Sequence, residues 1–198
     1  TGTGTQALPY KTYSKVNGLV LTEGILVYVK TGSSAPFAWN KNYQIKTVGF
    51  TRILSAVSAR GIDYDPAGTL AQELNGYDID MANVASSVGI RCEATAHPLT
   101  IKKFKIKNTI GACIESTTYS AQALNIEDCL IYSTGTRGVY SNKTTNIINS
   151  LINSTTYCVY KDNASATIIN ITNSKLISDA TPFRIYNIVD LTIIGGLL

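Results

Sequence analysis

The sequence predicts an all-β fold: a single-stranded, right-handed parallel β-helix with coils of about 21–25 residues and a short N-terminal capping helix. Two observations support this prediction. Residues 129–142, CLIYSTGTRGVYSN, are echoed by residues 150–163, SLINSTTYCVYKDN. Each unit also offers three short runs of alternating residues, separated by Asn, Ser, Gly and Thr, which is typical of three strands per coil.

Three columns of β-branched residues set the expected register. The first is Ile79, Ile101, Ile126, Ile147, Ile171 and Ile193. The second is Val84, Ile106, Ile131, Ile152, Ile177 and Leu198. The third is Ile90, Ile114, Val139, Val159 and Ile185, with Ile62 taking the part of Ile90 one coil earlier. Equivalent positions in neighbouring coils lie about 4.8 Å apart, so each column is expected to stack into a continuous core.

Two further columns accompany the core. The residues just before the first column are Asp78, Thr100, Asn125, Asn146, Asn170 and Thr192, and their amides are expected to form a hydrogen-bonded ladder. The residues just after the third column include Tyr140, Tyr160 and Tyr186, which alternation turns outward. These rings either stack on one another or offer a flat strip on which sugar rings lie.

The chain is expected to divide into an N-terminal cap over residues 1–44 and β-helix coils over residues 45–198. Pro9 opens a short helix, and Ile25, Val27 and Val29 line one side of a first strand. Residues 33–43 form an aromatic loop, in which Phe37 and Trp39 either cover the open end of the barrel or stack against sugars. Residues 45–54 and 60–64 form the first coil, and residues 65–76 leave it as an excursion with a helix-capable middle.

The N-terminal stretch resembles the start of many pectin-lyase-like right-handed β-helix proteins. The matching features are Gly2 and Gly4 in a turn, the Pro-Tyr-Lys-Thr segment at 9–12, a capping helix, and a first strand over 25–32. The resemblance covers the whole chain as architecture, but its specific motif covers only about the first 32 residues. The family contains polysaccharide lyases and hydrolases, phage tailspikes and fibres, and surface proteins without enzymatic activity, so it implies a fold more than a function.

Composition narrows the classes further. Hydrophobic residues make up 44% of the 198 residues and charged residues 15%, which argues against disorder. The net charge of +4 is spread along the chain, so no nucleic-acid partner is expected. No apolar run reaches the roughly 18 residues of a membrane span. Without a signal peptide or an initiating Met, the chain is expected to be a processed product or part of a longer one.

Candidate chemical groups are scattered. His97 has no nucleophile or acid nearby and is expected in a surface loop. The pairs Asp63/Asp65 and Asp78/Asp80 each face one way, roughly 6.5–7 Å apart, which fits an inverting glycosidase. Alternation around a buried residue produces the same spacing, so structural, catalytic and cation-binding roles stay open.

The basic residues and the cysteines complete the candidates. Arg91, Arg137 and Arg184 lie close in register, where they either solvate a sheet face or bind a carboxylate. The alternating lysines are read as a solvated strand face or as a contact for an anionic polymer: Lys102, Lys103, Lys105 and Lys107. The cysteines contain no CxxC pair and are expected to form neither a zinc site nor a disulfide: Cys92, Cys113, Cys129 and Cys158.

These patterns favour a non-enzymatic extracellular or virion component, structural or adhesive, with a polysaccharide or cell-surface glycan as its partner. The candidate glycan-binding residues are Tyr140, Tyr160, Tyr186, Trp39 and Phe37. The alternative is a polysaccharide lyase or glycoside hydrolase of the same fold. No cofactor, metal ligand or catalytic residue is assigned. The last coil is begun and not completed, which predicts a homotrimer, an end-to-end assembly or a longer chain.

Overall fold

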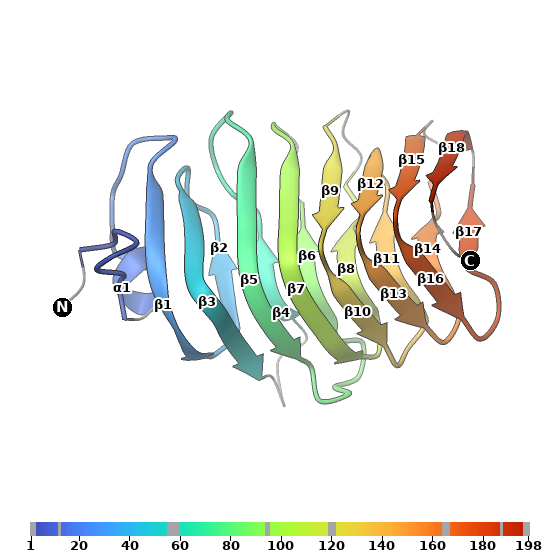
Figure 1. The fold of residues 1–198 in the computed structure, drawn as a ribbon, viewed down its shortest axis with the longest axis horizontal. Helices are drawn as coiled ribbons and strands as arrows, with labels where there is room; N and C mark the ends of the chain where they lie inside the picture. Colours follow the sequence, from blue (N-terminus) through green and yellow to red (C-terminus); the bar gives the residue numbers. More distant parts are fainter. Residues whose placement is uncertain are drawn as a thin grey trace.

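The computed structural model describes residues 3–11, 13–54, 60–93, 96–118, 122–163, 167–186 and 188–195, and it shows a parallel β-solenoid of about 6 turns with almost no helix (Figure 1). The elements follow the chain in this order: α1 (Tyr13–Asn17), β1 (Leu26–Ser34), β2 (Phe37–Trp39), β3 (Gln44–Leu54), β4 (Arg60–Tyr64), β5 (Gln72–Asp80), β6 (Val88–Cys92), β7 (Leu99–Thr109), β8 (Ala112–Ser116), β9 (Leu124–Glu127), β10 (Leu130–Ser133), β11 (Arg137–Ser141), β12 (Thr145–Ile148), β13 (Leu151–Ser154), β14 (Tyr157–Lys161), β15 (Thr167–Thr172), β16 (Lys175–Ser178), β17 (Phe183–Ile185) and β18 (Ile188–Ile194).

The strands form two parallel sheets that run the length of the solenoid. Sheet A has eleven strands: β1-β3-β5-β7-β9-β12-β15-β18 form its main path, and β10, β13 and β16 form a second row that joins it through β7. Sheet B has seven strands in the order β2-β4-β6-β8-β11-β14-β17. Figure 1 shows successive coils stacked side by side from the N-terminal helix to the C-terminal end. The predicted β-helix is therefore confirmed.

Sheet A bends at one residue per coil whose backbone is left-handed. In β3 and β5 this residue is glycine, Gly49 with φ 90° and Gly76 with φ 86°. In the later coils Asp128, Asn149 and Asn173 take φ values of 54°, 50° and 48° and separate β9 from β10, β12 from β13 and β15 from β16. Gly, Asn and Asp tolerate this region best, which is why the corner carries them. Lys103, with φ 54°, is the exception.

The core columns are mostly as predicted, but in the first and last coils a different residue occupies the column. The first column of the structure is Ile45, Leu74, Ile101, Ile126, Ile147, Ile171 and Ile193. The second is Ile53, Ile79, Ile106, Ile131, Ile152 and Leu176. The third is Ile62, Ile90, Ile114, Val139, Val159 and Phe183.

Four assignments to these columns are wrong. Ile79 belongs to the second column, because Leu74 pairs with Ile101, and this also leaves Val84 outside the columns, in the turn after β5. Leu176 replaces Ile177, because five residues separate the first two columns in the coils from β5 onward and a one-residue slip turns a side chain outward. Phe183 replaces Ile185 beside Val159. Leu198 lies outside the described residues.

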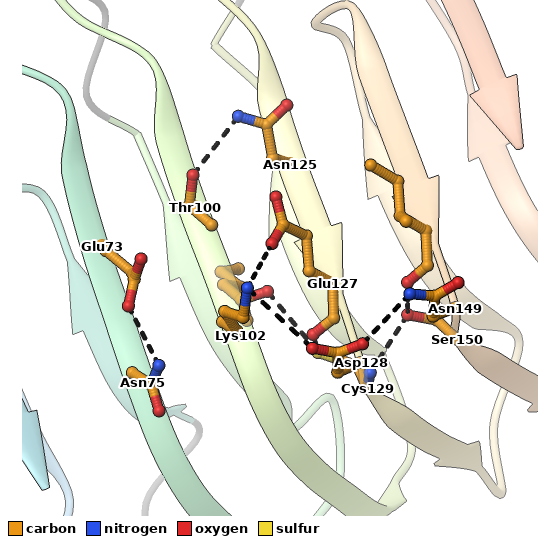
Figure 2. A network of polar contacts seen from close by, with 12 residues as sticks. Glu73, Asn75, Thr100, Lys102, Asn125, Glu127, Asp128, Cys129, Asn149 and Ser150 are labelled. Atoms are coloured by element: carbon orange, nitrogen blue, oxygen red, sulfur yellow. Dashed lines mark hydrogen bonds and ion pairs between the residues drawn. The ribbon is translucent and has the colours of Figure 1, made fainter. Parts of the chain in front are cut away.

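The amide ladder is confirmed from Thr100 to Asn170. Asn146 Nδ2 donates to Asn125 Oδ1 at 2.7 Å, and Asn170 Nδ2 donates to Asn146 Oδ1 at 2.8 Å. Asn125 Nδ2 closes the series on Thr100 Oγ1 at 3.3 Å (Figure 2). Thr192 is in register with Asn170. The assignment of Asp78 to this ladder is wrong. Glu73 is the residue that pairs with Thr100 in this column, whereas Asp78 pairs with Lys105.

A second, inner ladder was not predicted. Ser150 Oγ accepts a hydrogen bond from the backbone N–H of Cys129 at 3.0 Å, and Ser174 Oγ accepts one from the backbone N–H of Ser150 at 3.0 Å. Both serine side chains are buried at the corner of sheet A. These bonds satisfy buried backbone donors where the left-handed residue interrupts the strand ladder.

The N-terminal end is closed as expected, by α1 and the aromatic residues beneath it. Val16 of α1 is fully buried, and Tyr43 donates its hydroxyl proton to the Val16 carbonyl at 2.8 Å. The Trp39 and Tyr43 rings meet edge-on with centroids 5.3 Å apart. Residues 33–43 are not simply an aromatic loop, however, because Phe37–Trp39 is β2 and pairs with β4. The coil before residue 45 was therefore missed.

The predicted excursion over residues 65–76 is too long. Strand β5 begins at Gln72, so only residues 65–71 leave the coil, and they contain no helix. This segment is held by Glu23, whose carboxylate accepts the backbone N–H groups of Thr69 and Leu70. It is also held by His97, whose Nε2 lies 3.2 Å from the Pro66 carbonyl oxygen.

Candidate functional site

A group of aromatic and arginine side chains gathers on the outer face of sheet B near its C-terminal end. We call it the tyrosine–arginine cluster. Strand β11 supplies Arg137 and Tyr140, β14 supplies Tyr157 and Tyr160, and β17 supplies Arg184. Stacking aligns them, because Arg137 pairs with Tyr157, Tyr140 with Tyr160, and Tyr160 with Arg184.

The rings and guanidinium groups of the cluster are in direct contact. Arg137 Cζ lies 4.6 Å from the Tyr140 ring centroid and 4.2 Å from that of Tyr160. Arg184 Cζ lies 5.7 Å from the Tyr157 centroid and 5.6 Å from that of Tyr160. Both arginines are within cation–π range, so each guanidinium is held over an aromatic face.

The tyrosine rings do not form the parallel stack that a simple ladder would give. Tyr140 and Tyr160 meet edge-on, with centroids 5.1 Å apart and planes at 86°, and Tyr157 is tilted by 41° against Tyr160 at 5.5 Å. Edge-to-face contact is a preferred arrangement of aromatic quadrupoles. Tyr160 is only 8% exposed. It is therefore the covered centre of the cluster, while Tyr140 and Tyr157 are half-buried around it.

Polar contacts fix the rim of the cluster. Tyr140 donates its hydroxyl proton to Asp162 Oδ2 at 2.6 Å, and burial together with this carboxylate raises the pKa of the Tyr140 phenol well above its usual value. Arg184 donates to the hydroxyl oxygens of Tyr157 at 3.3 Å and Tyr186 at 2.9 Å. The placement of Tyr186 in the Tyr160 column is wrong, because Arg184 occupies that position. Tyr186, 47% exposed, joins the cluster through Arg184 instead.

The N-terminal half of the same face carries charged residues. Asp63, Arg91 and Glu115 are neighbours in one column, and Glu115 pairs with Tyr140 at its end. Arg60 Nη1 lies 3.0 Å from Asp63 Oδ2, and Arg91 Nε lies 3.4 Å from Asp63 Oδ1. This half is therefore a chain of ion pairs, with no aromatic ring contact between its described side chains.

Two carboxyl groups beside these ion pairs have opposite pKa shifts, and sequence reasoning missed both. Burial, helped by the nearby Glu93 charge, raises the pKa of Glu115 against the lowering effect of Arg137, Arg60 and Arg91. Burial also acts on Glu93, but hydrogen bonds from Thr118 and Thr117 outweigh it and hold the pKa of Glu93 below its usual value. The two glutamates are one coil apart, and a search for i, i+2 pairs does not find them.

The predicted acid pairs do not offer two free carboxylates: each pair has a member that already contacts basic or hydrogen-bonding residues. Asp65 is exposed beyond the end of β4, while Asp63 pairs with arginines. Asp80 lies 3.1 Å from Lys107 Nζ and accepts hydrogen bonds from Asn108 and the Ala82 backbone. Burial alone would raise the pKa of Asp80, but these partners lower it overall. Asp80 therefore acts as a hydrogen-bond acceptor that holds the turn after β5.

The other predicted glycan-binding residues lie at the opposite end of sheet B. Phe37 and Trp39 belong to β2, the strand farthest from β17 in that sheet. Trp39 is 1% exposed, so its indole offers no face to a sugar, and Phe37 is half-buried with its ring 6.1 Å from that of Tyr77. The structure therefore separates these two residues from the tyrosines.

The histidine and the cysteines are buried. His97 is 1% exposed, so its placement in a solvated loop is wrong, and Nδ1 and Nε2 each lie 3.2 Å from a proline carbonyl oxygen. All four cysteines are unpaired, and burial raises the pKa of Cys113 to about 12 and of Cys158 to about 11. Among the described residues no group of three or more His, Cys, Asp or Glu could hold a metal ion.

Neither a membrane-spanning helix among the described residues nor a related protein was found. Within the described ranges, no helix has the length and apolar character needed to cross a membrane. No family model matches the chain, and comparison with curated proteins and with solved structures finds no match.

Proposed function

We propose that this chain is a non-enzymatic β-helix module of a virion or cell surface, structural or adhesive in role, and that the tyrosine–arginine cluster is its glycan-binding surface. The observation that carries this proposal is the contact of two arginines with three tyrosines on one outer sheet face. Sugars present apolar C–H faces and hydroxyl edges. Half-buried tyrosine rings suit the former, and guanidinium and carboxylate groups suit the latter.

The rigid support of the cluster favours binding without loop closure. The members on β11 and β14 stand beside buried residues of the third core column, Val139 and Val159, and Arg184 on β17 stands beside the half-buried Phe183. A site that is already formed loses little side-chain freedom when a ligand binds. The solenoid architecture and the N-terminal motif together support membership of the pectin-lyase-like family, which is consistent with an extracellular or virion location. In a tailspike-like assembly the partner would be two further copies of the chain.

The second candidate function is a polysaccharide lyase or glycoside hydrolase. One observation favours it: Glu115 and Glu93 lie beside the cluster with pKa values shifted in opposite directions. Environments that push two carboxyl pKa values apart are how acid and base roles are divided in glycosidases. The ion pairs around Glu115 are equally those of a solvated sheet face, and so the non-enzymatic proposal is preferred.

Binding and turnover assays with one panel of polysaccharides test both candidates. Hyaluronate and alginate serve as acidic probes and dextran and mannan as neutral probes, with affinity and new reducing or unsaturated ends followed in parallel. We expect binding of at least one probe without products. Tyr157→Ala should weaken that binding about tenfold or more. Tyr132→Ala, a half-buried tyrosine on sheet A, is the matched control and should bind like wild type.

Two outcomes would overturn these assignments. Product formation that is lost in Glu115→Gln would establish the enzymatic alternative. Undiminished affinity in Tyr157→Ala would remove the cluster from the binding surface.

A further inference from the structure

The two ends of the solenoid expose apolar side chains that its middle lacks. Across the described residues between 71 and 163, Leu130 is the only large apolar side chain that is exposed. The helix α1 and the strand β18 lie at opposite ends of the stack of coils (Figure 1). Exposed apolar side chains that gather in this way mark surfaces for association. The N-terminal end exposes Leu8, Val20, Ile25 and Leu70, and β18 exposes Leu191, Ile193 and Ile194.

The C-terminal end leaves the solenoid core open. Leu191 and Ile193 are 40% and 36% exposed, although they pair with Ile169 and Ile171, which are 2% and 1% exposed. The difference arises because β18 ends the main path of sheet A, so no described coil packs over it. The strand also lacks the lysine and proline residues that commonly protect a free edge. The last coil therefore presents apolar side chains and unpaired backbone groups to a partner.

The N-terminal end is closed in a different way. The N-terminal segment occupies the outer edge of β1: Tyr28 donates its backbone N–H to the Gly4 carbonyl at 2.7 Å, and Lys30 donates its own to the Tyr10 carbonyl at 2.6 Å. A strand of another chain cannot add to β1 where these bonds are made. This end instead presents side chains, and Val20, between α1 and β1, is 98% exposed. The N-terminal cap is therefore a finished surface with apolar side chains on it.

The two ends also differ in charge. Residues 1–44 contain four lysines and one glutamate, which gives them a net charge of +3. The last coil after β16 carries two exposed carboxylates, Asp179 and Asp190. Its guanidinium group, that of Arg184, already donates to the hydroxyl oxygens of Tyr157 and Tyr186. A basic end and an acidic end attract each other, whereas two copies of the same end repel each other.

We propose that the last coil of one chain docks on the N-terminal cap of a second copy of the chain. Leu191 and Ile193 then pack on Val20 and its apolar neighbours, and the carboxylates of the last coil lie near the lysines of the cap. Because the two surfaces differ, the contact is heterologous, and its repetition along the solenoid axis gives an open-ended series rather than a closed dimer. The contact uses β18 and the cap, so it stands or falls independently of glycan binding by the tyrosine–arginine cluster.

Sedimentation velocity at a series of concentrations tests this contact, with one variant blocked at each end. Val20→Glu adds an acidic group to the cap and Ile193→Lys adds a basic group to the last coil, so each repels the end it would meet. We expect wild type to form species that grow beyond a dimer as concentration rises, and each variant alone to associate about tenfold more weakly or less. An equimolar mixture of the two variants should form dimers that grow no further, because each variant keeps one intact end.

That mixture also shows that both variants are folded, since each must present its intact end. Leu130→Lys is the matched control, because Leu130 is exposed on β10, away from both ends, and this variant should assemble like wild type. The proposal is overturned if wild type stays monomeric at its highest soluble concentration, or if the mixture of variants does not associate. It is also overturned by a closed dimer that survives in Val20→Glu, which would show that two last coils meet, and by a loss of assembly in Leu130→Lys, which would indicate side-by-side contact.

Discussion

The outer face of sheet B differs between its two halves, although the inner face does not. Inside, one column of buried residues continues from Ile62 to Val159. Outside, the column changes from Asp63, Arg91 and Glu115 to tyrosine and arginine. Stacking of coils constrains the inward side chains strictly and leaves the outward ones free. The difference therefore points to function in the C-terminal half rather than to a need of the fold.

The two halves also differ in the kind of contact they make. Partly exposed ion pairs such as Arg91–Asp63 contribute about 0–1 kcal/mol and weaken in salt. Aromatic pairs and cation–π contacts each contribute about 0.5–1.5 kcal/mol, and salt screens them less. The C-terminal half is thus a pre-formed apolar and cationic surface, whereas the N-terminal half is a solvated one.

The largest expected loss of stability comes from placing a charge in the third core column. The loss should be the same in both halves, because this column runs through both. Ile90→Asp and Val139→Asp each bury an unpaired charge at a position with 0% exposure, and each should lower the free energy of unfolding by about 3–5 kcal/mol. Denaturant titration measures the loss. Ile177→Asp is the control, since Ile177 is 36% exposed and should lose less than about 1 kcal/mol. An equal loss in the control would mean that the register is misplaced.

A smaller effect should separate the halves. Tyr140→Phe removes the hydrogen bond to Asp162, and it should cost about 1 kcal/mol of unfolding free energy at neutral pH. Tyr132→Phe should cost almost nothing, because the described residues give its hydroxyl no partner. Thermal melts of the two variants make the comparison. Equal stability of Tyr140→Phe and wild type would show that the rim of the cluster is not held as described.

The two glutamates predict opposite pH responses. Glu115 has a raised folded pKa, so the native state holds its proton more tightly, and stability falls as pH rises from the unfolded value through the folded one. Glu93 has a lowered folded pKa, so its contribution is present above the unfolded value and is lost as pH falls through the folded one. Glu115→Gln should therefore raise stability at neutral pH, while Glu93→Gln should lower it. Melting temperatures across acidic to neutral pH would refute this if both variants moved the same way.

The smallest effect is expected from the ion pairs. Arg91→Gln should cost less than about 1 kcal/mol at low salt, and the difference from wild type should shrink as salt is added. Denaturant titrations at two salt concentrations measure it. A larger, salt-independent loss would give the N-terminal half a structural role like that of the cluster.

Sequence reasoning recovered the repeating coils better than their edges. The columns from Ile101 to Ile171 were assigned correctly, because five residues separate them from the second column in each coil. Errors arose at Ile79, Ile177 and Ile185, next to turns whose lengths vary and shift the alternation. The N-terminal coil was missed because Phe37–Trp39 is a strand of only three residues, too short to show a recognisable alternation.

The cluster was only partly visible in the sequence. Tyr140 and Tyr160 follow the core column directly, so alternation finds them. Arg137 was named as a sheet-face residue without a place in the tyrosine column, and Tyr157 was not named. Both lie three residues before those tyrosines, where strict alternation would turn them inward. Two consecutive buried residues, Gly138 and Val139 in β11, shift the strand and bring Arg137 to the outer face. The electrostatic effect of Glu93 on Glu115 depends on coil stacking, which no local sequence pattern reports.

Mapping of a bound oligosaccharide on the two halves of sheet B tests the central claim most directly. Fragments of whichever polysaccharide in the panel binds best would be titrated into the labelled chain, and amide shifts would be followed along the sheet. We predict shifts on β11, β14 and β17, absent from β4 and β6 and abolished in Tyr157→Ala. Shifts centred on β4 and β6, or a pattern unchanged by Tyr157→Ala, would contradict the claim that the tyrosine–arginine cluster is the glycan-binding surface.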